Sequence, residues 1–350
     1  MTTPSHPRRR LLAASLLLTL PDLAAQAAPG SAKVWRVGPG LAISRIADAI
    51  GRAADGDTIE ILPGVYAGDV AVIGQRRLSL VGLGSGPQDR PVLRAAGQTA
   101  QGKAIWVVRD GDIQVANLHF EGARVADRNG AGIRFEKGHL RVAQCSFIDN
   151  QNGILTGNDR DSSLNIEDCD FGDAPADPGS LPHLLYVGRI AHVSVRGSRF
   201  RAGHEGHLIK SRARRSTLIG NLLDDGPTGQ ASYEIDLPEG GDALVEGNTV
   251  VQAAGTQNPV MLSYGAEGGQ WPRNQLTLRR NTFVNRLASS GWFVRVWADR
   301  LPAGTGVLSQ GNRYLGPGSL LLGPASRTVD DQRGPAPPAG PAGGQLSFER

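Results

Sequence analysis

The chain has 350 residues, of which 47 are glycine, and aromatic residues make up only 5% of it. This length is ample for a large core, whereas the high glycine content and scarce aromatics argue against an ordinary helical or doubly wound domain. The net charge is +4, but the sequence contains no basic block with interleaved aromatic residues. Nucleic-acid binding is therefore not indicated.

The first 27 residues are typical of an export signal. Residues 8–10 are all arginine, residues 11–20 are apolar but too few to span a bilayer, and Ala25-Gln26-Ala27 fits a cleavage site of small residues. The arginines and the leucines after them loosely resemble a twin-arginine signal, and an ordinary secretory signal fits equally well. We expect cleavage after Ala27, which leaves 34 basic and 32 acidic residues in a periplasmic or extracellular protein.

No later segment is apolar enough to span a membrane, so we expect the mature chain to be a soluble monomer. It begins with a strand at residues 34–37. An amphipathic helix at about residues 41–53 follows, with Ile46, Ala49 and Ile50 on one face. This helix is expected to cover the open first coil of the domain described next, whose unpaired strands would otherwise invite aggregation.

Eight short segments along the chain share one shape, a few small or polar residues that end in a large apolar one. They recur every 23 to 33 residues, an irregular period that suits a solenoid whose turns vary in length. The eight apolar anchors are Phe120, Phe147, Phe171, Phe200, Leu223, Val250, Phe283 and Tyr314.

Between the anchors, the hydrophobic pattern alternates as in β-strands. Residues 133–136, 233–237 and 292–296 alternate, and a second short strand follows each of them, as at residues 140–142. Several short strands per repeat with no helix between them predict an all-β right-handed parallel β-helix solenoid. Its domain is expected to span residues 28–316, and the Pro- and Gly-rich residues 317–350 are expected to be disordered.

Two residues before each anchor lies a second series. Its last four members, Asn221, Asn248, Asn281 and Asn312, predict a structural asparagine ladder at one turn. Cys145 and Cys169 occupy the same place in two adjacent coils. A disulfide is possible in an exported protein, but stacked side chains that point the same way favour two buried free thiols.

The segment Gly56-Asp57-Thr58-Ile59 through Pro63-Gly64-Val65-Tyr66 resembles the first coil of bacterial pectate-lyase-like β-helix proteins. That superfamily includes polysaccharide lyases, glycoside hydrolases, epimerases, esterases and non-catalytic adhesins. The resemblance therefore implies a polysaccharide partner and the fold, and it leaves the chemistry open.

A second stretch resembles a narrower group. Glu205-Gly-His-Leu-Ile-Lys210-Ser211, followed by Asn221, is similar to the central motif of the alginate lyase and chondroitinase B family. The resemblance implies that Glu205 binds calcium and that Lys210 removes the proton next to a uronate carboxylate. Where that family has an assisting arginine on the next coil, this chain has Glu234 and Asp236.

The alternation of residues 233–237 predicts that Glu234 and Asp236 point outward together, about 6.6 Å apart. Aligning the anchors places Lys210 on the same outward face. We expect neighbouring side chains to bind substrate: Arg212, His207, Tyr264 and Arg295.

Three functions fit this patch, and a polysaccharide lyase acting on uronates is favoured. In that hypothesis Lys210 is the base, and Glu205, Glu234 and Asp236 hold Ca²⁺ through oxygen ligands. In the second, Glu234 and Asp236 are the acid and base of a glycoside hydrolase, which needs no metal. In the third, a ladder of polar side chains binds glycan without cleaving it.

Overall fold

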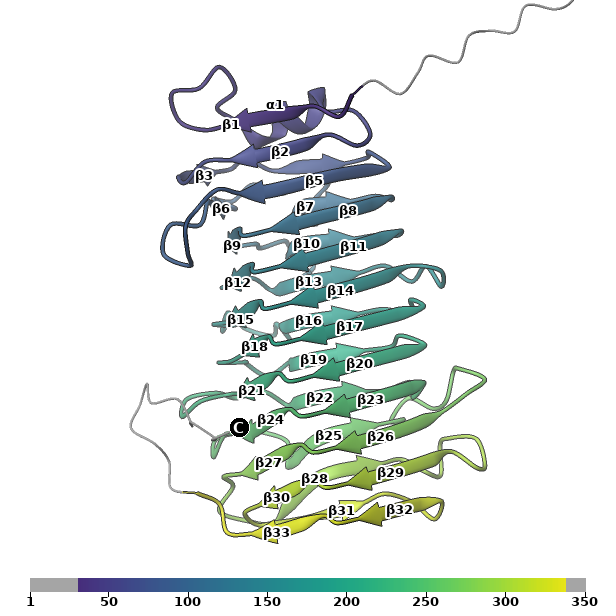
Figure 1. Cartoon of the computed structure of the whole chain (residues 1–350). Coiled ribbons are helices and arrows are strands. Elements are labelled where there is room, and N and C mark those ends of the chain that lie inside the picture. The colour runs from purple at the N-terminus through teal and green to yellow at the C-terminus, as the bar shows by residue number, and fades with distance from the viewer. Residues whose placement is uncertain (1–30, 338–350) are drawn as a thin grey trace, which may run out of the picture. The chain divides into compact units, whose positions relative to one another are not determined.

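The computed structural model describes residues 31–337, which form a parallel β-helix built from three long sheets (Figure 1). Every pair of neighbouring strands is parallel, and neighbours in a sheet come from successive coils. The solenoid is right-handed, the hand that parallel crossover connections take. The fold predicted from the repeat is confirmed. No helix in these residues is long and apolar enough to cross a membrane.

Sheet A has twelve strands, and its side chains alternate between the interior and the surface. In β11, for example, Leu140 and Val142 are buried while His139 and Arg141 are exposed. The strands are β1 (Val34–Val37), β2 (Thr58–Ile61), β5 (Arg77–Gly82), β8 (Asp112–Ala116), β11 (His139–Ala143), β14 (Ser163–Glu167), β17 (His192–Arg196), β20 (Arg215–Ile219), β23 (Asp242–Glu246), β26 (Gln275–Arg279), β29 (Gly306–Gln310) and β32 (Ser326–Val329).

Sheet B has eleven short strands, and it carries the predicted row of apolar anchors. The rings of Phe120, Phe147, Phe171 and Phe200 stack in the interior with centroids 5.0, 4.8 and 4.7 Å apart. The strands are β3 (Val65–Ala67), β6 (Val92–Arg94), β9 (His119–Glu121), β12 (Ser146–Ile148), β15 (Asp170–Gly172), β18 (Arg199–Phe200), β21 (Leu222–Asp224), β24 (Thr249–Gln252), β27 (Thr282–Asn285), β30 (Arg313–Leu315) and β33 (Gln332–Gly334).

Sheet C has ten strands and positions the candidate site. Its strands are β4 (Ala71–Ile73), β7 (Ala104–Val108), β10 (Ala131–Phe135), β13 (Asn152–Thr156), β16 (His183–Val187), β19 (His207–Ser211), β22 (Tyr233–Leu237), β25 (Val260–Tyr264), β28 (Gly291–Val296) and β31 (Gly318–Leu321).

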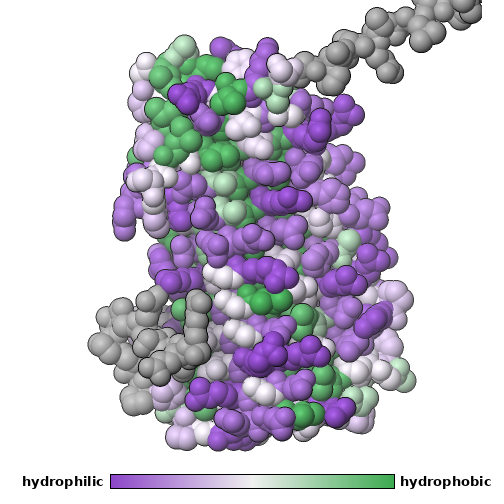
Figure 2. Space-filling model, in the orientation of Figure 1, coloured by the Kyte–Doolittle hydropathy of each residue, from purple (hydrophilic) through white to green (hydrophobic). Residues whose placement is uncertain are grey.

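The capping helix is present but shorter than predicted. α1 (Ile46–Arg52) packs Ile46, Ala49 and Ile50 onto the first coil. The Asp69 carboxylate accepts hydrogen bonds from the N–H groups of Ile46 and Ala47, which satisfies the start of the helix. Figure 2 shows a mostly hydrophilic surface, with apolar side chains gathered near the end of the solenoid that carries α1.

The asparagine ladder forms as predicted. The side-chain amide of Asn221 donates to Asn248, that of Asn248 to Asn281 and that of Asn281 to Asn312, over 2.9 to 3.0 Å. The carboxylate of Asp331 ends the ladder, because it accepts the bond from the Asn312 backbone at 2.8 Å. Cys145 and Cys169 are buried free thiols, as the stacking of their positions favoured.

The predicted end of the domain at residue 316 is wrong. β31, β32 and β33 add a further coil, so the solenoid continues to Gly334. In this last coil Arg333 follows Tyr314 in register, and its guanidinium lies over the Phe293 and Tyr314 rings at 5.8 and 5.9 Å. The predicted export signal at residues 1–27 and the final residues of the predicted tail lie outside the described residues.

Candidate functional site

The candidate site lies on the outer face of sheet C. Strand register places one outward side chain from each coil in a continuous row, which we call the outer row. It consists of Arg134, Leu155, Tyr186, Lys210, Asp236, Ser263 and Arg295. Lys210 and Asp236 therefore come together on adjacent coils, as the anchor alignment predicted.

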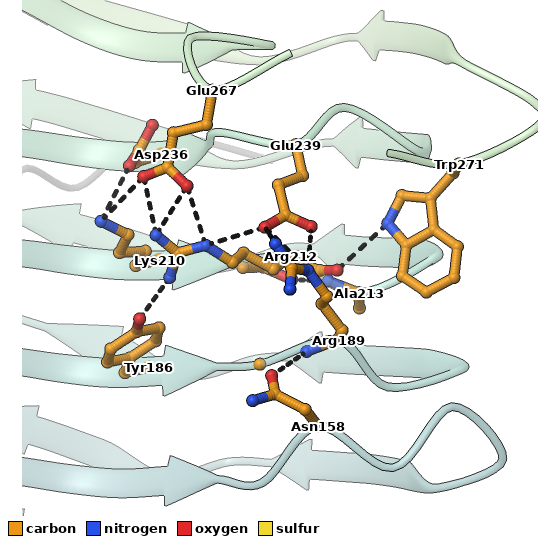
Figure 3. Close-up of polar contacts among 12 residues, drawn as sticks. Asn158, Tyr186, Arg189, Lys210, Arg212, Ala213, Asp236, Glu239, Glu267 and Trp271 are labelled. Carbon is orange, nitrogen blue, oxygen red and sulfur yellow. Dashed lines mark hydrogen bonds and ion pairs between the residues drawn. The ribbon is translucent and has the colours of Figure 1, made fainter. Parts of the chain in front are cut away.

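Lys210 is the centre of a charged network (Figure 3). Its Nζ lies 3.7 Å from Oδ2 of Asp236 and 3.8 Å from Oε1 of Glu267, and its side chain is 13% exposed. The same Nζ lies 5.7 Å from the centre of the Tyr186 ring. Both distances to the carboxylates exceed hydrogen-bond length, so these contacts are ion pairs without hydrogen bonds. A charged group of a substrate could therefore bind between Lys210 and the two carboxylates.

Asp236 is the most perturbed carboxyl group on this face. It is 4% exposed, and burial raises its pKa to about 6 in spite of the opposing charge of Lys210 and a hydrogen bond from Ser263. His207 Nδ1 lies 3.5 Å from Asp236 Oδ2 but makes no hydrogen bond. Because burial and the neighbouring His183 hold the His207 pKa well below its usual value, that imidazole is neutral and the contact is not an ion pair.

A second group of charges adjoins Lys210. Arg212 binds Glu267 through Nη2 at 2.7 Å and Glu239 through Nε at 3.2 Å, and it also donates to the Tyr186 hydroxyl. Nη2 of Arg189 lies 2.6 Å from Oε1 of Glu239. Burial favours a raised Glu267 pKa, but the hydrogen bonds from Arg212 outweigh it and hold that pKa below its usual range.

The loop after β25 completes the site. It carries Glu267, and the indole of Trp271 donates to the Arg212 carbonyl at 3.1 Å, which fixes the loop over the end of β19 (Figure 3). Three cations thus meet three carboxylates. Four members of this site share no motif and lie far apart in the sequence, which therefore does not indicate them: Tyr186, Arg189, Glu239 and Trp271.

A groove of about 400 Å³ adjoins the network on the N-terminal side. Arg134, Leu155 and Tyr186 of the outer row form part of its lining, together with Lys103. Glu136 pairs with both cations, with Lys103 at 2.7 Å and with Arg134 at 3.2 Å. The outer row therefore joins an open groove to the charged network.

The prediction that Glu234 shares this face is wrong. Glu234 is fully buried, and neither carboxylate oxygen has a hydrogen-bond partner in the described residues. The register pairs skip its position, so the strict alternation is broken there and the side chain turns inward. The equivalent positions of neighbouring coils hold interior residues: Gly132, Gly153, Leu184, Leu208, Met261 and Phe293.

The other predicted residues divide between site and scaffold. Tyr264 is structural, because it is fully buried and its hydroxyl donates to the Gly241 carbonyl at 2.5 Å. Arg295 stays on the outer row, with its guanidinium 3.6 Å from the centre of the Trp297 ring. His207 lies beside Asp236, although its ring is packed between His183 and Tyr233.

The three predicted calcium ligands do not lie close together. Glu234 faces the interior, whereas Glu205 pairs with Gln257 at 3.3 Å and Asp236 with Lys210. Among residues 31–337 no three His, Cys, Asp or Glu side chains are placed to share a metal ion. The donor set therefore does not fit Ca²⁺.

Comparison with solved structures finds similar backbones at low sequence identity. A pectate lyase, Pel9A, is 13% identical over 85% of this chain and 79% of its own, with a TM-score of 0.49. Geobacillus virus E2 ORF18 is 10% identical over 82% and 56%, with a TM-score of 0.45. Pectin methylesterase PemA from Erwinia chrysanthemi is 12% identical over 91% and 92%, with a TM-score of 0.37. No protein-family model and no curated protein sequence matches the chain.

Proposed function

We propose that this chain is a polysaccharide lyase that cleaves uronate-containing glycans on the outer face of sheet C. One observation carries the proposal. Asp236 combines near-complete burial, a pKa of about 6 and a lysine 3.7 Å away. A carboxyl group that titrates close to neutral pH beside a fixed cation is suited to proton transfer.

Elimination beside a uronate carboxylate requires three groups. A base takes the proton from the carbon next to the carboxylate, a cation stabilises the negative charge that develops, and the glycosidic oxygen leaves with a proton. Ionised Asp236 supplies the base, and the Lys210 ammonium faces the developing charge. The Tyr186 hydroxyl, which accepts a hydrogen bond from Arg212, is the donor to the leaving oxygen.

This assignment exchanges the roles expected from the resemblance. Lys210 lies between the carboxylates of Asp236 and Glu267 and forms ion pairs with both. The additional cations on this face, Lys103 and Arg134 at the groove and Arg295 on the outer row, supply charge for further uronate units.

Hydrolysis is the second candidate, and a specific observation favours it. Asp236 and Glu267 both contact Lys210, and their pKa values move in opposite directions. A pair of carboxyl groups whose environments separate their pKa values can act as acid and base. Asp236 would then be the acid, and Glu267 would be the base.

A panel of acidic and neutral polysaccharides tests these proposals. Ultraviolet absorbance detects the unsaturated ends that elimination produces, and a reducing-end assay detects cleavage of either kind. Unsaturated ends from a uronate polymer are the expected result. Reducing ends without them would favour hydrolysis, and binding without cleavage would contradict both reactions. We expect a chelator to leave the rate unchanged, because no calcium ligand set forms among the described residues.

A further inference from the structure

A separate group of reactive side chains lies on the outer face of sheet B. Nδ1 of His119 lies 2.7 Å from the Ser146 hydroxyl, and Nε2 of the same ring lies 3.0 Å from a carboxylate oxygen of Glu121. A nucleophile, a base and an acid that orients the base are thus in hydrogen-bonding sequence. β9 and β12, which carry them, are adjacent in Figure 1.

The fold explains why these three side chains meet. Phe120 is fully buried, so His119 and Glu121 on either side of it both point outward. Ser146 is the register partner of His119 on the next coil, where parallel strands lie about 4.8 Å apart. Strand alternation and register therefore bring the three side chains together. All three lie on strands, so no loop has to move to assemble the group.

The hydrogen bonds define the charge state of the group. Burial favours a raised Glu121 pKa, but bonds from Arg94 and His119 outweigh it and hold that pKa below its usual value. Ionised Glu121 can only accept, so Nε2 of His119 carries the hydrogen and Nδ1 is free to accept from Ser146. Arg94 pairs with the second oxygen of Glu121 and holds the carboxylate in place.

A cation completes the surroundings. Arg90, whose side chain is 9% exposed, donates through Nε to Asn117 at 3.2 Å, and its Nη1 lies 3.9 Å from Asp170. Asn117 precedes β9 and Asp170 begins β15, the two strands that flank β12 in sheet B. The serine is 8% exposed, so it is covered but still reaches the surface.

We propose that Ser146, His119 and Glu121 form a second catalytic centre, an esterase for esters of small carboxylic acids. The Ser146 oxygen attacks the ester carbon while its proton passes to Nδ1 of His119, and Arg90 faces the negative oxygen that forms. The C–O bond then breaks, the alcohol leaves with that proton, and water releases the acid from Ser146 by the same route. A small acyl group is the fitting class, because Ser146 is only 8% exposed and its surroundings leave little room for a bulky one.

The chain supplies a matched control. In sheet A, Nδ1 of His139 lies 2.8 Å from the Ser163 hydroxyl, in the same register relation as His119 and Ser146. In the described residues no carboxylate makes a hydrogen bond to that histidine. Ser163 therefore has the histidine without the acid.

The test uses a fluorophosphonate label mapped by mass spectrometry and hydrolysis of p-nitrophenyl acetate. We expect adduct formation at Ser146 and none at Ser163. Ser146→Ala should reduce hydrolysis to background and Glu121→Gln should lower it on the order of 100-fold, whereas Ser163→Ala should match the unmodified protein. Circular dichroism checks that each variant is folded.

Equal labelling of the two serines, or hydrolysis by Ser146→Ala at the rate of the unmodified protein, would overturn the proposal. The labelling is read on the unmodified chain, so it decides the question even if a variant fails to fold. Neither measurement uses a polysaccharide, and the result is independent of the reaction proposed for Lys210 and Asp236.

Discussion

Glu234 is a carboxyl group in a row of interior apolar side chains. It has no hydrogen-bond partner among the described residues, and the neighbouring coil places Met261 at the equivalent position. We expect Glu234→Met to raise the melting temperature, because it replaces an unsatisfied buried polar group by an apolar one of similar size. Glu167→Met is the control, since Glu167 is an exposed carboxylate at the end of β14. A lower melting temperature for Glu234→Met would show that the carboxyl group has a stabilising partner.

The same residue gives the stability a pH dependence. Burial raises the Glu234 pKa well above its ordinary value of 4.5. Above that pH the unfolded chain loses the proton while the folded chain keeps it, so the free energy of unfolding falls as pH rises, by up to about 1.4 kcal/mol per pH unit. Denaturant titrations at several pH values should show this slope in the unmodified protein. The slope should be smaller in Glu234→Met.

Asp236 is expected to control the pH dependence of the proposed elimination. As a base it must be ionised, so the rate should rise with pH and reach half its maximum near the pKa of about 6. Asp236→Asn should lower the rate on the order of 100-fold or more. Asp110→Asn, which breaks the exposed Asp110–Lys137 pair, is the matched control and should keep full activity. A rate that falls as pH rises through this range would instead identify Asp236 as an acid.

The sequence predicted the site in part. The anchor spacing placed Lys210 and Asp236 on adjacent coils, since register depends on apolar residues that can be read directly. Glu234 could not be placed correctly, because the sequence Tyr-Glu-Ile-Asp-Leu alternates regularly even though the side chains of this strand do not. Partners such as Arg189 and Glu239 were missed because 50 residues separate them in the chain.

At the scale of elements, the aromatic row of sheet B was predictable because one large side chain ends each repeat. Phe200 stacks on Phe171 with ring centroids 4.7 Å apart. We expect Phe200→Ala to lower the free energy of unfolding by about 3–5 kcal/mol, as large core truncations do. Leu181→Ala, at a residue that is 63% exposed, should change little. Equal effects of the two substitutions in denaturant titrations would contradict this packing.

The helix and the ladder show what local pattern can and cannot define. The periodicity located the capping helix, but only its second half is helical, since α1 begins at Ile46 and the backbone of Arg45 before it is extended. The ladder could be read from four asparagines at one position. Asp331, which ends the ladder, was not predicted, because it lies in a segment whose composition indicated disorder.

The whole molecule extends one coil further than the sequence predicted. Proline and glycine are frequent after residue 316, yet short strands of three or four residues tolerate them between coils. A chain that ends at Gly316 would lose the carboxylate that accepts from Asn312 and the guanidinium over Tyr314. We expect that truncation to lower the melting temperature by several degrees, whereas ending at Pro337 should have little effect. Identical melting curves for the two truncations would show that the last coil adds no stability.

Asp331 and Arg333 of that last coil also bear on association between molecules. Each sheet ends in a strand with free hydrogen-bonding groups, which is a template for another chain to add a strand. An incoming coil would have to stack on Asp331 and Arg333, and it would bury a carboxylate and a guanidinium without partners of its own. With α1 across the other end, the solenoid resembles a fibril of fixed length, one whose ends are closed to elongation.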